Sequence, residues 1–170
     1  MMQAPSRVPR RWFLLLALAV FGADQLSKKL VLEQMLPGET HTVIPGLFAL
    51  TYLRNRGAAF GLLADFDSGW ILGGLIALSA LALALVGRWL WHGPATAASG
   101  GGLALILGGA LGNLFDRLRE GSVVDFLDFH LGPYHWPAFN LADAAIVVGA
   151  GILLYASLRD SRRLARTGRA

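Results

Sequence analysis

The sequence contains no cysteine and little charge. Without cysteine, the chain cannot form disulfides, carry a thiolate nucleophile or bind a metal through sulfur. His130 and His135 are five residues apart and lack the HExxH pattern, so we expect no metal site at these residues. Only 15% of the 170 residues are charged. Because cysteine and a metal-binding pattern are both lacking, we expect a protein that works without a metal or any other cofactor.

The chain consists largely of hydrophobic residues, 55% of the total, which gather in long runs. A membrane-spanning helix needs roughly 20 largely uncharged residues. The run Ala95–Phe115 has no charge, and Phe139–Leu158 has one, Asp143. We predict an all-α membrane protein with a single domain, residues 1–170, and four transmembrane helices. The predicted spans are residues 11–32, 70–91, 103–119 and 139–158, with approximate ends.

The first predicted span has a competing interpretation. Arginines precede a short apolar run, Trp12–Ala23, as in a secretory signal peptide. The cleavage pattern is poor, because the bulky Phe21 lies two residues before Ala23, where a small residue is wanted. Cleavage would also leave three spans and place the basic C-terminal tail outside. We therefore favour a retained first helix.

The basic residues predict an orientation. If both termini are cytoplasmic, nine of the 15 Lys and Arg residues lie on the inner side with a single acid, Asp160. This asymmetry follows the positive-inside rule for short loops. The net charge of +4 then reflects topology and contact with anionic membrane lipid. It does not indicate nucleic-acid binding, because the basic residues do not share one folded face.

The two predicted outer segments, residues 33–69 and 120–138, are more than linkers. Leu47–Leu53 is rich in aromatic and apolar residues and is bounded by turn-forming or polar residues, which favours a short strand. We predict a small extracytoplasmic cap of β-like and loop structure. The sequence leaves two roles open for the strand: an edge for an extended peptide, or a cover over the helix ends.

Polar residues collect near the outer membrane boundary, where ionisable groups are costly and indicate function. Residues three or four apart share a helix face. The groups that do so are Asp24 with Lys28, Asn113 with Asp116 and Arg117, and Asn140 with Asp143. The last two spans run in opposite directions, so the loop between them brings Asp125 to the level of Asp143.

Structural roles compete with functional ones for these residues. Asp116 and Arg117 fit an interfacial ion pair that anchors a helix. Asp24 and Lys28 fit a simple i,i+4 pair in which Lys28 extends to the lipid headgroups. We expect Asp128 to be solvated.

Asp125 and Asp143 point to a specific chemistry. Asp143 lies one turn into a span and has no basic residue near it in sequence, so a structural role explains it poorly. Two adjacent carboxyl groups in a poorly solvated site share one proton, because both cannot ionise cheaply. The ionised group then takes a proton from water while the protonated group donates a hydrogen bond to a scissile carbonyl. This pattern predicts an aspartyl protease.

Other functions fit less well. Ser27 and Lys28 are adjacent on a helix and do not face each other, which argues against a Ser–Lys dyad. The GxGD motif of presenilin-like and prepilin aspartyl proteases is absent. Two alternatives remain open. One is a small proton-coupled carrier that uses Asp24, Asp116 and Asp143, and the other is a non-catalytic assembly factor.

Five ordered stretches carry a resemblance to a known family. They are Asp24–Lys28 (DQLSK), Asn55–Phe60 (NRGAAF), Gly109–Arg117 (GALGNLFDR), Val123–Phe126 (VVDF) and Phe139–Asp143 (FNLAD). Each is weak alone, but their order along nearly the whole chain is specific. The chain resembles the lipoprotein signal peptidase (signal peptidase II) family. Ser27 and Gly61 are mild departures, standing where Thr and Ser are common.

The resemblance implies a substrate and a set of site residues. Such enzymes, in the bacterial inner membrane, remove the signal peptide of diacylglyceryl-modified prolipoproteins, cutting on the amino side of the lipidated cysteine. Asp125 and Asp143 match the catalytic pair, which would lie near the outer leaflet. The expected supporting residues are Asp24, Lys28, Asn55, Gly109, Asn113, Asp116, Arg117, Asn140 and Ala142. Membrane lipid and globomycin-like cyclic peptide inhibitors are implied as further partners.

Overall fold

Four long helices make up most of the molecule. The structure, a computed structural model, describes residues 8–57, 69–93 and 96–166. The helices are α1 (Arg10–Gln34), α2 (Gly69–His92), α3 (Ala97–Glu120) and α4 (Leu141–Arg166). Within the described residues α2, α3 and α4 are long and apolar enough to cross a membrane. The protein is thus mostly helical, with three helices that could cross a membrane, and the count of four spans stays a prediction.

A small antiparallel sheet follows the order β1-β2-β3-β4. Its strands are β1 (Thr40–Ile44), β2 (Phe48–Asn55), β3 (Val123–Leu131) and β4 (Tyr134–His135). Two hairpin turns depend on glycine, because Gly46 and Gly132 have φ angles of 76° and 56°, which favour a residue without a side chain. β2 and β3 are far apart in sequence but pair directly, with Leu53 opposite Asp125.

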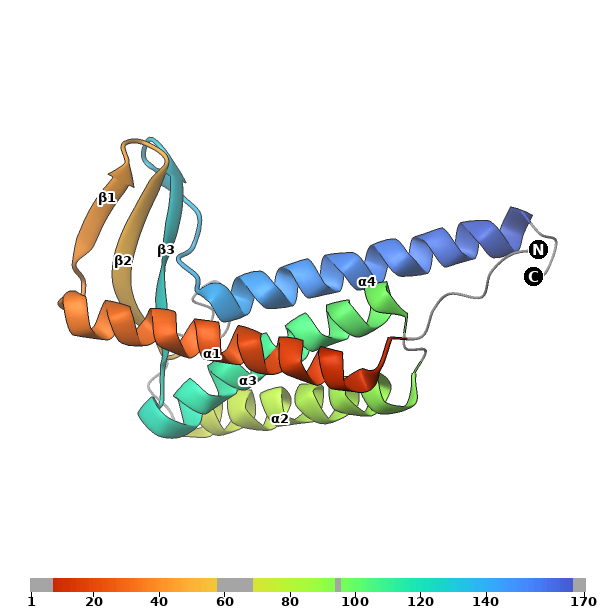
Figure 1. The fold of residues 1–170 in the computed structure, drawn as a ribbon. Helices are drawn as coiled ribbons and strands as arrows, with labels where there is room; N and C mark the ends of the chain where they lie inside the picture. Colours follow the sequence, from red (N-terminus) through yellow and green to blue (C-terminus); the bar gives the residue numbers. More distant parts are fainter. Residues whose placement is uncertain (1–7, 58–68, 94–95, 167–170) are drawn as a thin grey trace.

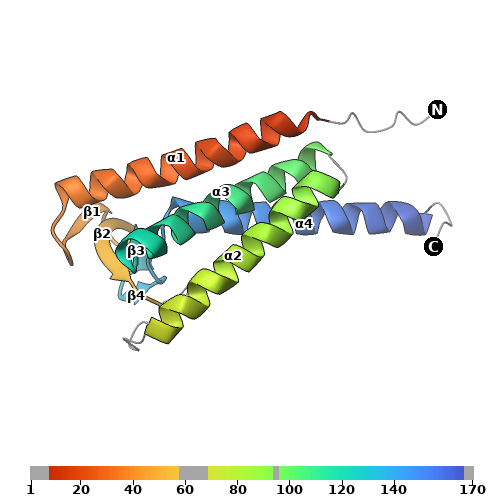
Figure 2. The same cartoon turned by 90° about the horizontal axis from the view of Figure 1, so that it is seen from below.

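The sheet stands at one end of the helical bundle, and the start of α1 and the end of α4 lie at the other end (Figure 1). The view from below shows α2 at an oblique angle to α3, with the two helices closest at the end away from the sheet (Figure 2). α3 is central, since it packs against α1, α2 and α4. β3 begins two residues after Gly121, which ends α3 in a left-handed conformation with φ 67°. This short connection holds β3 next to the end of the bundle.

Glycines allow the helices to approach closely. A Cβ atom on Gly108 would lie 2.5 Å from the carbonyl oxygen of Ala17 in α1, and one on Gly109 would collide with the carbonyl oxygen of Ala142 in α4. One on Gly102 would lie 2.9 Å from the carbonyl oxygen of Gly149. Small residues at such contacts are typical of membrane helix packing, which relies on close van der Waals contact.

The structure corrects several boundaries. α3 begins at Ala97, six residues before the predicted start at 103, and α4 begins at Leu141 and continues to Arg166 instead of ending at 158. The predicted strand at Leu47–Leu53 is confirmed as β2. β2 is internal, however, with β1 on one side and β3 on the other, so the edge proposed for an extended peptide is already paired. Residues 58–60 of the NRGAAF stretch, like Gly61, lie outside the described residues.

The first helix is continuous through the region considered for signal-peptide cleavage. α1 runs from Arg10 to Gln34 without interruption. Phe13 and Ala17, which cleavage would remove, are buried in a core cluster with residues of α2 and α3. A retained first helix is thus the form that completes this core.

Candidate active site

Asp125 lies on β3, where its carboxyl group is held by two amides. Its side chain is only 4% exposed. Asn55 of β2 donates to one carboxyl oxygen at 2.9 Å, and Asn140 donates to the other at 2.7 Å. The sequence interpretation of Asp125 as a loop acid is wrong in this respect, because β2 pairing makes Val123–Leu131 a strand.

Asp143 lies in the first turn of α4 and helps to begin that helix. The Asp143 amide donates to Oδ1 of Asn140 at 2.9 Å, while the Asn140 amide donates to Oδ2 of Asp143 at 3.3 Å. This reciprocal pair is a capping box, which satisfies amides that the first helical turn leaves without partners. The other Asp143 oxygen accepts a hydrogen bond from Asn113 at 2.8 Å. Capping and contact with α3 therefore fix the position of the carboxyl group.

Asn140 joins the two aspartates. It has no exposed surface, and its Nδ2 donates both to Asp125 and, at 3.3 Å, to Oδ1 of Asn113. Its Oδ1 accepts from the backbone of Asp143. Asn140 thus forms hydrogen bonds with both aspartates and holds the start of β3 beside the start of α4.

A buried ionic cluster lies beside this pair, between α1 and α3. Lys28 is 3% exposed, and its Nζ lies 2.7 Å from Asp24, 2.6 Å from Asp116 and 2.9 Å from Oδ1 of Asn113. A buried ammonium group needs such partners to offset its desolvation. Asp24 also accepts the Ala142 amide at 3.0 Å, so its carboxylate lies at the positive N-terminal end of α4.

The predicted roles of these charges need two corrections. Asp116 makes its short ion pair with Lys28 of α1 and not with its neighbour Arg117. Adjacent residues on a helix point in different directions, so a neighbouring pair is disfavoured. Lys28 does not extend to the headgroups, because its ammonium group is enclosed by three oxygen partners.

Arg117, in the last turn of α3, binds the backbone of Gly57, which lies just after β2. Its guanidinium donates to the carbonyl oxygen of Gly57 at 3.1 Å and to that of Asn113 at 3.3 Å. Its positive charge also interacts with Asp143 and Asp125. Arg117 therefore offsets negative charge at the pair.

Burial raises the pKa of Asp125 to about 6, because its charged form loses hydration. The Asn55 hydrogen bond acts in the opposite direction, and the charge of Asp143 raises the pKa further. Asp125 and Asp143 therefore interact electrostatically. A carboxyl group with this pKa holds its proton to a higher pH than a solvated aspartate.

A cavity of about 470 Å³ opens beside the two aspartates. Asn55, Asp125 and Asp143 provide its polar side. Its remaining lining is Trp136, Pro137, Ala138, Phe139, Ala144, Ile146, Val147 and Val148. An apolar wall with a few converging polar groups is typical of a ligand site.

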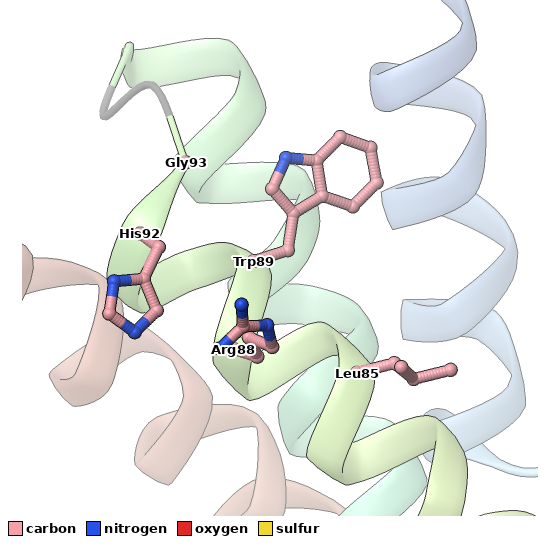
Figure 3. A pocket seen from close by; sticks show the side chains of 5 residues that line it. All are labelled: Leu85, Arg88, Trp89, His92 and Gly93. Atoms are coloured by element: carbon pink, nitrogen blue, oxygen red, sulfur yellow. The ribbon is translucent and has the colours of Figure 1, made fainter.

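A second cavity, of about 390 Å³, lies at the C-terminal end of α2. Figure 3 shows its lining, Leu85, Arg88, Trp89, His92 and Gly93, which includes no carboxyl group. It offers no acid for catalysis.

The structure brings together every residue singled out from the sequence for the site. Gly109 and Ala142 act through their backbones. The absence of a side chain on Gly109 lets α3 lie close to α4 at Ala142. Sequence reasoning missed Gln25, which donates to Asp116 at 2.8 Å, and Gly112, whose missing Cβ leaves room for the Asp24 carboxylate. Both lie in the stretches quoted above, and their position beside Asp24 and Asn113 was the available signal.

Fold and site together define a helical membrane protein with two interacting carboxyl groups beside an apolar cavity. Two solved structures described as bacterial membrane enzymes share the fold. One has a TM-score of 0.83 at 28% identity and covers 94% of both chains, and the other has a TM-score of 0.80 at 28% identity.

Sequence comparison identifies the family. The pattern described as signal peptidase (SPase) II matches residues 16–159. A protein of Azoarcus named lipoprotein signal peptidase is 46% identical over 172 residues, covering 98% of this chain and 93% of the relative. One of Syntrophotalea carbinolica with the same name is 44% identical over 153 residues, covering 90% and 94%. The chain belongs to the signal peptidase II family.

Proposed function

We propose that this peptidase removes the signal peptide from diacylglyceryl-modified prolipoproteins, cutting on the amino side of the lipidated cysteine, with Asp125 and Asp143 as the catalytic pair. The observation that carries the assignment is the shared contact of both acids with Asn140 at the edge of an apolar cavity. The prolipoprotein class is the one that the names of the relatives imply.

The chemistry follows from two carboxyl groups that share one proton. The ionised group accepts a proton from a water molecule, and that water attacks the scissile carbonyl carbon. The protonated group donates its hydrogen bond to the carbonyl oxygen and then supplies a proton to the departing amine. A proton shared in this way belongs to the pair and not to either residue. The rate should have a bell-shaped pH dependence.

The apolar cavity suits a lipid-modified substrate. Its wall, residues 136–139 of the cap and 144–148 of α4, is rich in aromatic and aliphatic side chains. Acyl chains on the substrate cysteine would remain in the bilayer while the bond to be cut reaches Asp125. Membrane lipid and cyclic peptides of the globomycin type would occupy the same polar and apolar surfaces.

We infer a topology of four transmembrane helices in one integral-membrane domain, residues 1–170. Both termini would be in the cytoplasm, and the sheet and the aspartate pair would lie at the outer leaflet of the bacterial inner membrane. α1 supports this count, because its charged residues Asp24 and Lys28 are enclosed by protein and not exposed to lipid. The basic residues of the C-terminal part of α4 support the inner location of that end.

The test is cleavage of a synthetic diacylated prolipoprotein by the wild type, Asp125→Asn and Asp143→Asn. Asparagine keeps the shape and one of the two acceptor oxygens, and the Tm of each variant shows whether it folds. We expect kcat to fall by about three orders of magnitude or more in each, and the double variant to be little worse, because the pair acts as a unit. Processing at the wild-type rate by either variant would sink the assignment.

The same variants separate the two alternative functions. An assembly factor would keep its binding role without the charges, and a proton-coupled carrier would show flux in proteoliposomes without peptide cleavage. The buried ionisable groups Asp24, Lys28 and Asp116 form one cluster, and four helices leave little room for a proton path.

A further inference from the structure

Three potential metal ligands meet on the sheet, away from the aspartate pair. They are Asp128 and His130 of β3 and His135 of β4, whose ligand atoms all lie within 4.8 Å of one another. The expectation that Asp128 is solvated is wrong, because its residue is 9% exposed and its carboxyl oxygens each lie 2.9 Å from Nδ1 of His135.

The strand geometry explains why these side chains converge. Residues two apart on a strand point to the same face, which places Asp128 and His130 together. His135 is the direct partner of His130 in the β3–β4 ladder, so it projects from that face as well. Asp125 is an odd number of residues from Asp128 and therefore belongs to the opposite face. The cluster is thus separate from the carboxyl pair.

One ring nitrogen in the cluster has no hydrogen-bond partner. Nδ1 of His130 is buried and forms no hydrogen bond, although it lies 3.9 Å from the carboxylate of Asp128. A buried polar atom without a partner costs free energy. The rings of His130 and His135 are stacked, with centroids 4.6 Å apart. Two imidazoles and one carboxylate with ligand atoms this close together form a donor set suited to zinc-like cations.

We propose that Asp128, His130 and His135 bind one divalent transition-metal ion, with zinc as the representative cation. Three protein ligands leave a fourth position for water. His135 has a side chain that is 54% exposed, which provides an entry path for the ion. The sequence argument against a metal concerned an HExxH catalytic site, and this site follows instead from strand pairing.

The bound ion would stabilise the pairing of β4 with β3. β4 has only two residues, and the chain passes directly from it into Trp136–Phe139, which line the cavity beside the aspartates. Backbone hydrogen bonds already join this segment to β3: the Trp136 amide donates to the Phe129 carbonyl at 2.8 Å, and Phe139 bonds to Phe126 and Leu127. An ion shared by β3 and β4 would add a link through side chains. It would steady the cavity wall without contacting the substrate bond.

The test measures metal binding and not peptide cleavage, so it is independent of the proposed function. The full chain, without an affinity tag, is purified in detergent and stripped with EDTA. Zn²⁺ is then titrated in competition with a chromophoric chelator. We expect one zinc per chain and at least about tenfold weaker binding in His135→Gln and Asp128→Asn, since each loses a ligand. Zinc should also raise the Tm of the wild type but not of these variants.

Matched controls define the site. His41→Gln removes another histidine of the sheet, whose Nε2 lies 2.9 Å from Glu39, and it should bind zinc like the wild type. The double variant Asp125→Asn/Asp143→Asn should also bind normally. No saturable binding, equal binding by His135→Gln, or loss in either control would each overturn the proposal. His135→Gln changes an exposed residue, so its result does not depend on refolding a buried cluster.

Discussion

Asn140 uses all of its polar side-chain atoms within the site. It donates to Asp125 and Asn113 and accepts from the Asp143 amide. An amide cannot change charge, so it can hold two acids in place while their protonation changes during a reaction. The same logic applies to Asn55 and Asn113, each of which donates to one aspartate.

At this scale the first prediction concerns pH. The raised pKa of Asp125, about 6 against 3.8, means that the folded state binds this proton more tightly than the unfolded state. Its contribution to stability is present below pH 3.8 and is lost as the pH rises through about 6. We expect the Tm of the wild type to fall more steeply than that of Asp125→Asn between about pH 4 and pH 7. Thermal unfolding in detergent at a series of pH values measures this, and parallel curves would contradict it.

A second prediction concerns the ion cluster. Lys28→Met leaves Asp24 and Asp116 buried without their cation, which costs about 3–5 kcal/mol for an unpaired buried charge. We expect a large fall in Tm and loss of cleavage. Lys29→Met is the matched control, because the Lys29 side chain is 68% exposed and its ion pair with Glu33 is long, at 3.7 Å. Comparable Tm changes in the two variants would show that the cluster does not stabilise the fold.

At the scale of elements, α3 explains the boundary that sequence patterning missed. Ala97–Gly102 has the composition of a linker, and glycine lowers helix propensity. These glycines are nevertheless helical, because Gly100 contacts the Phe13 ring of α1 and Gly102 contacts α4. Tertiary contacts supply the free energy that the local sequence lacks. The hydrophobic runs predicted the bulk of each helix but not its ends.

The contact between α3 and α4 leads to a third prediction. In Gly109→Ala, the added Cβ meets the Ala142 carbonyl, so α4 must move and carry Asn140 and Asp143 with it. We expect destabilisation of about 1–3 kcal/mol, typical of overpacking, together with reduced cleavage. Gly101→Ala is the control, because nothing lies within 4 Å of its added Cβ. Its Tm should stay the same or rise, and a fall equal to that of Gly109→Ala would argue against the close contact.

At the scale of the whole molecule, the sheet lies at one end of the bundle, and the start of α1 and the end of α4 lie at the other (Figure 1). The outward faces of the helices carry many exposed leucines and valines, for example Leu78, Leu81 and Val147. In water such a surface would aggregate, whereas in a bilayer it faces acyl chains. The polar cluster is enclosed by protein, which is the arrangement that a membrane requires of ionisable groups.

The proposed topology can be mapped directly, because the chain has no cysteine of its own. Single variants Pro9→Cys, Thr42→Cys and Ser161→Cys place a thiol before α1, on β1 and near the end of α4. We expect a membrane-impermeant maleimide to label Thr42→Cys in intact spheroplasts, and the other two only after lysis. Labelling of Pro9→Cys in intact spheroplasts would mean that α1 does not cross the membrane with the proposed orientation.

The sequence alone determined which segments are apolar enough to form the bundle and which polar residues gather at one end. Both follow from local composition and helical spacing, which need no knowledge of contacts. Only the tertiary structure decided which distant residues these polar side chains contact. Lys28 binds Asp116 across 88 residues, and β2 places Asn55 against Asp125, because helix packing at glycines and strand pairing set which faces meet. Such long-range choices depend on shape complementarity among elements, and no short stretch of sequence encodes them.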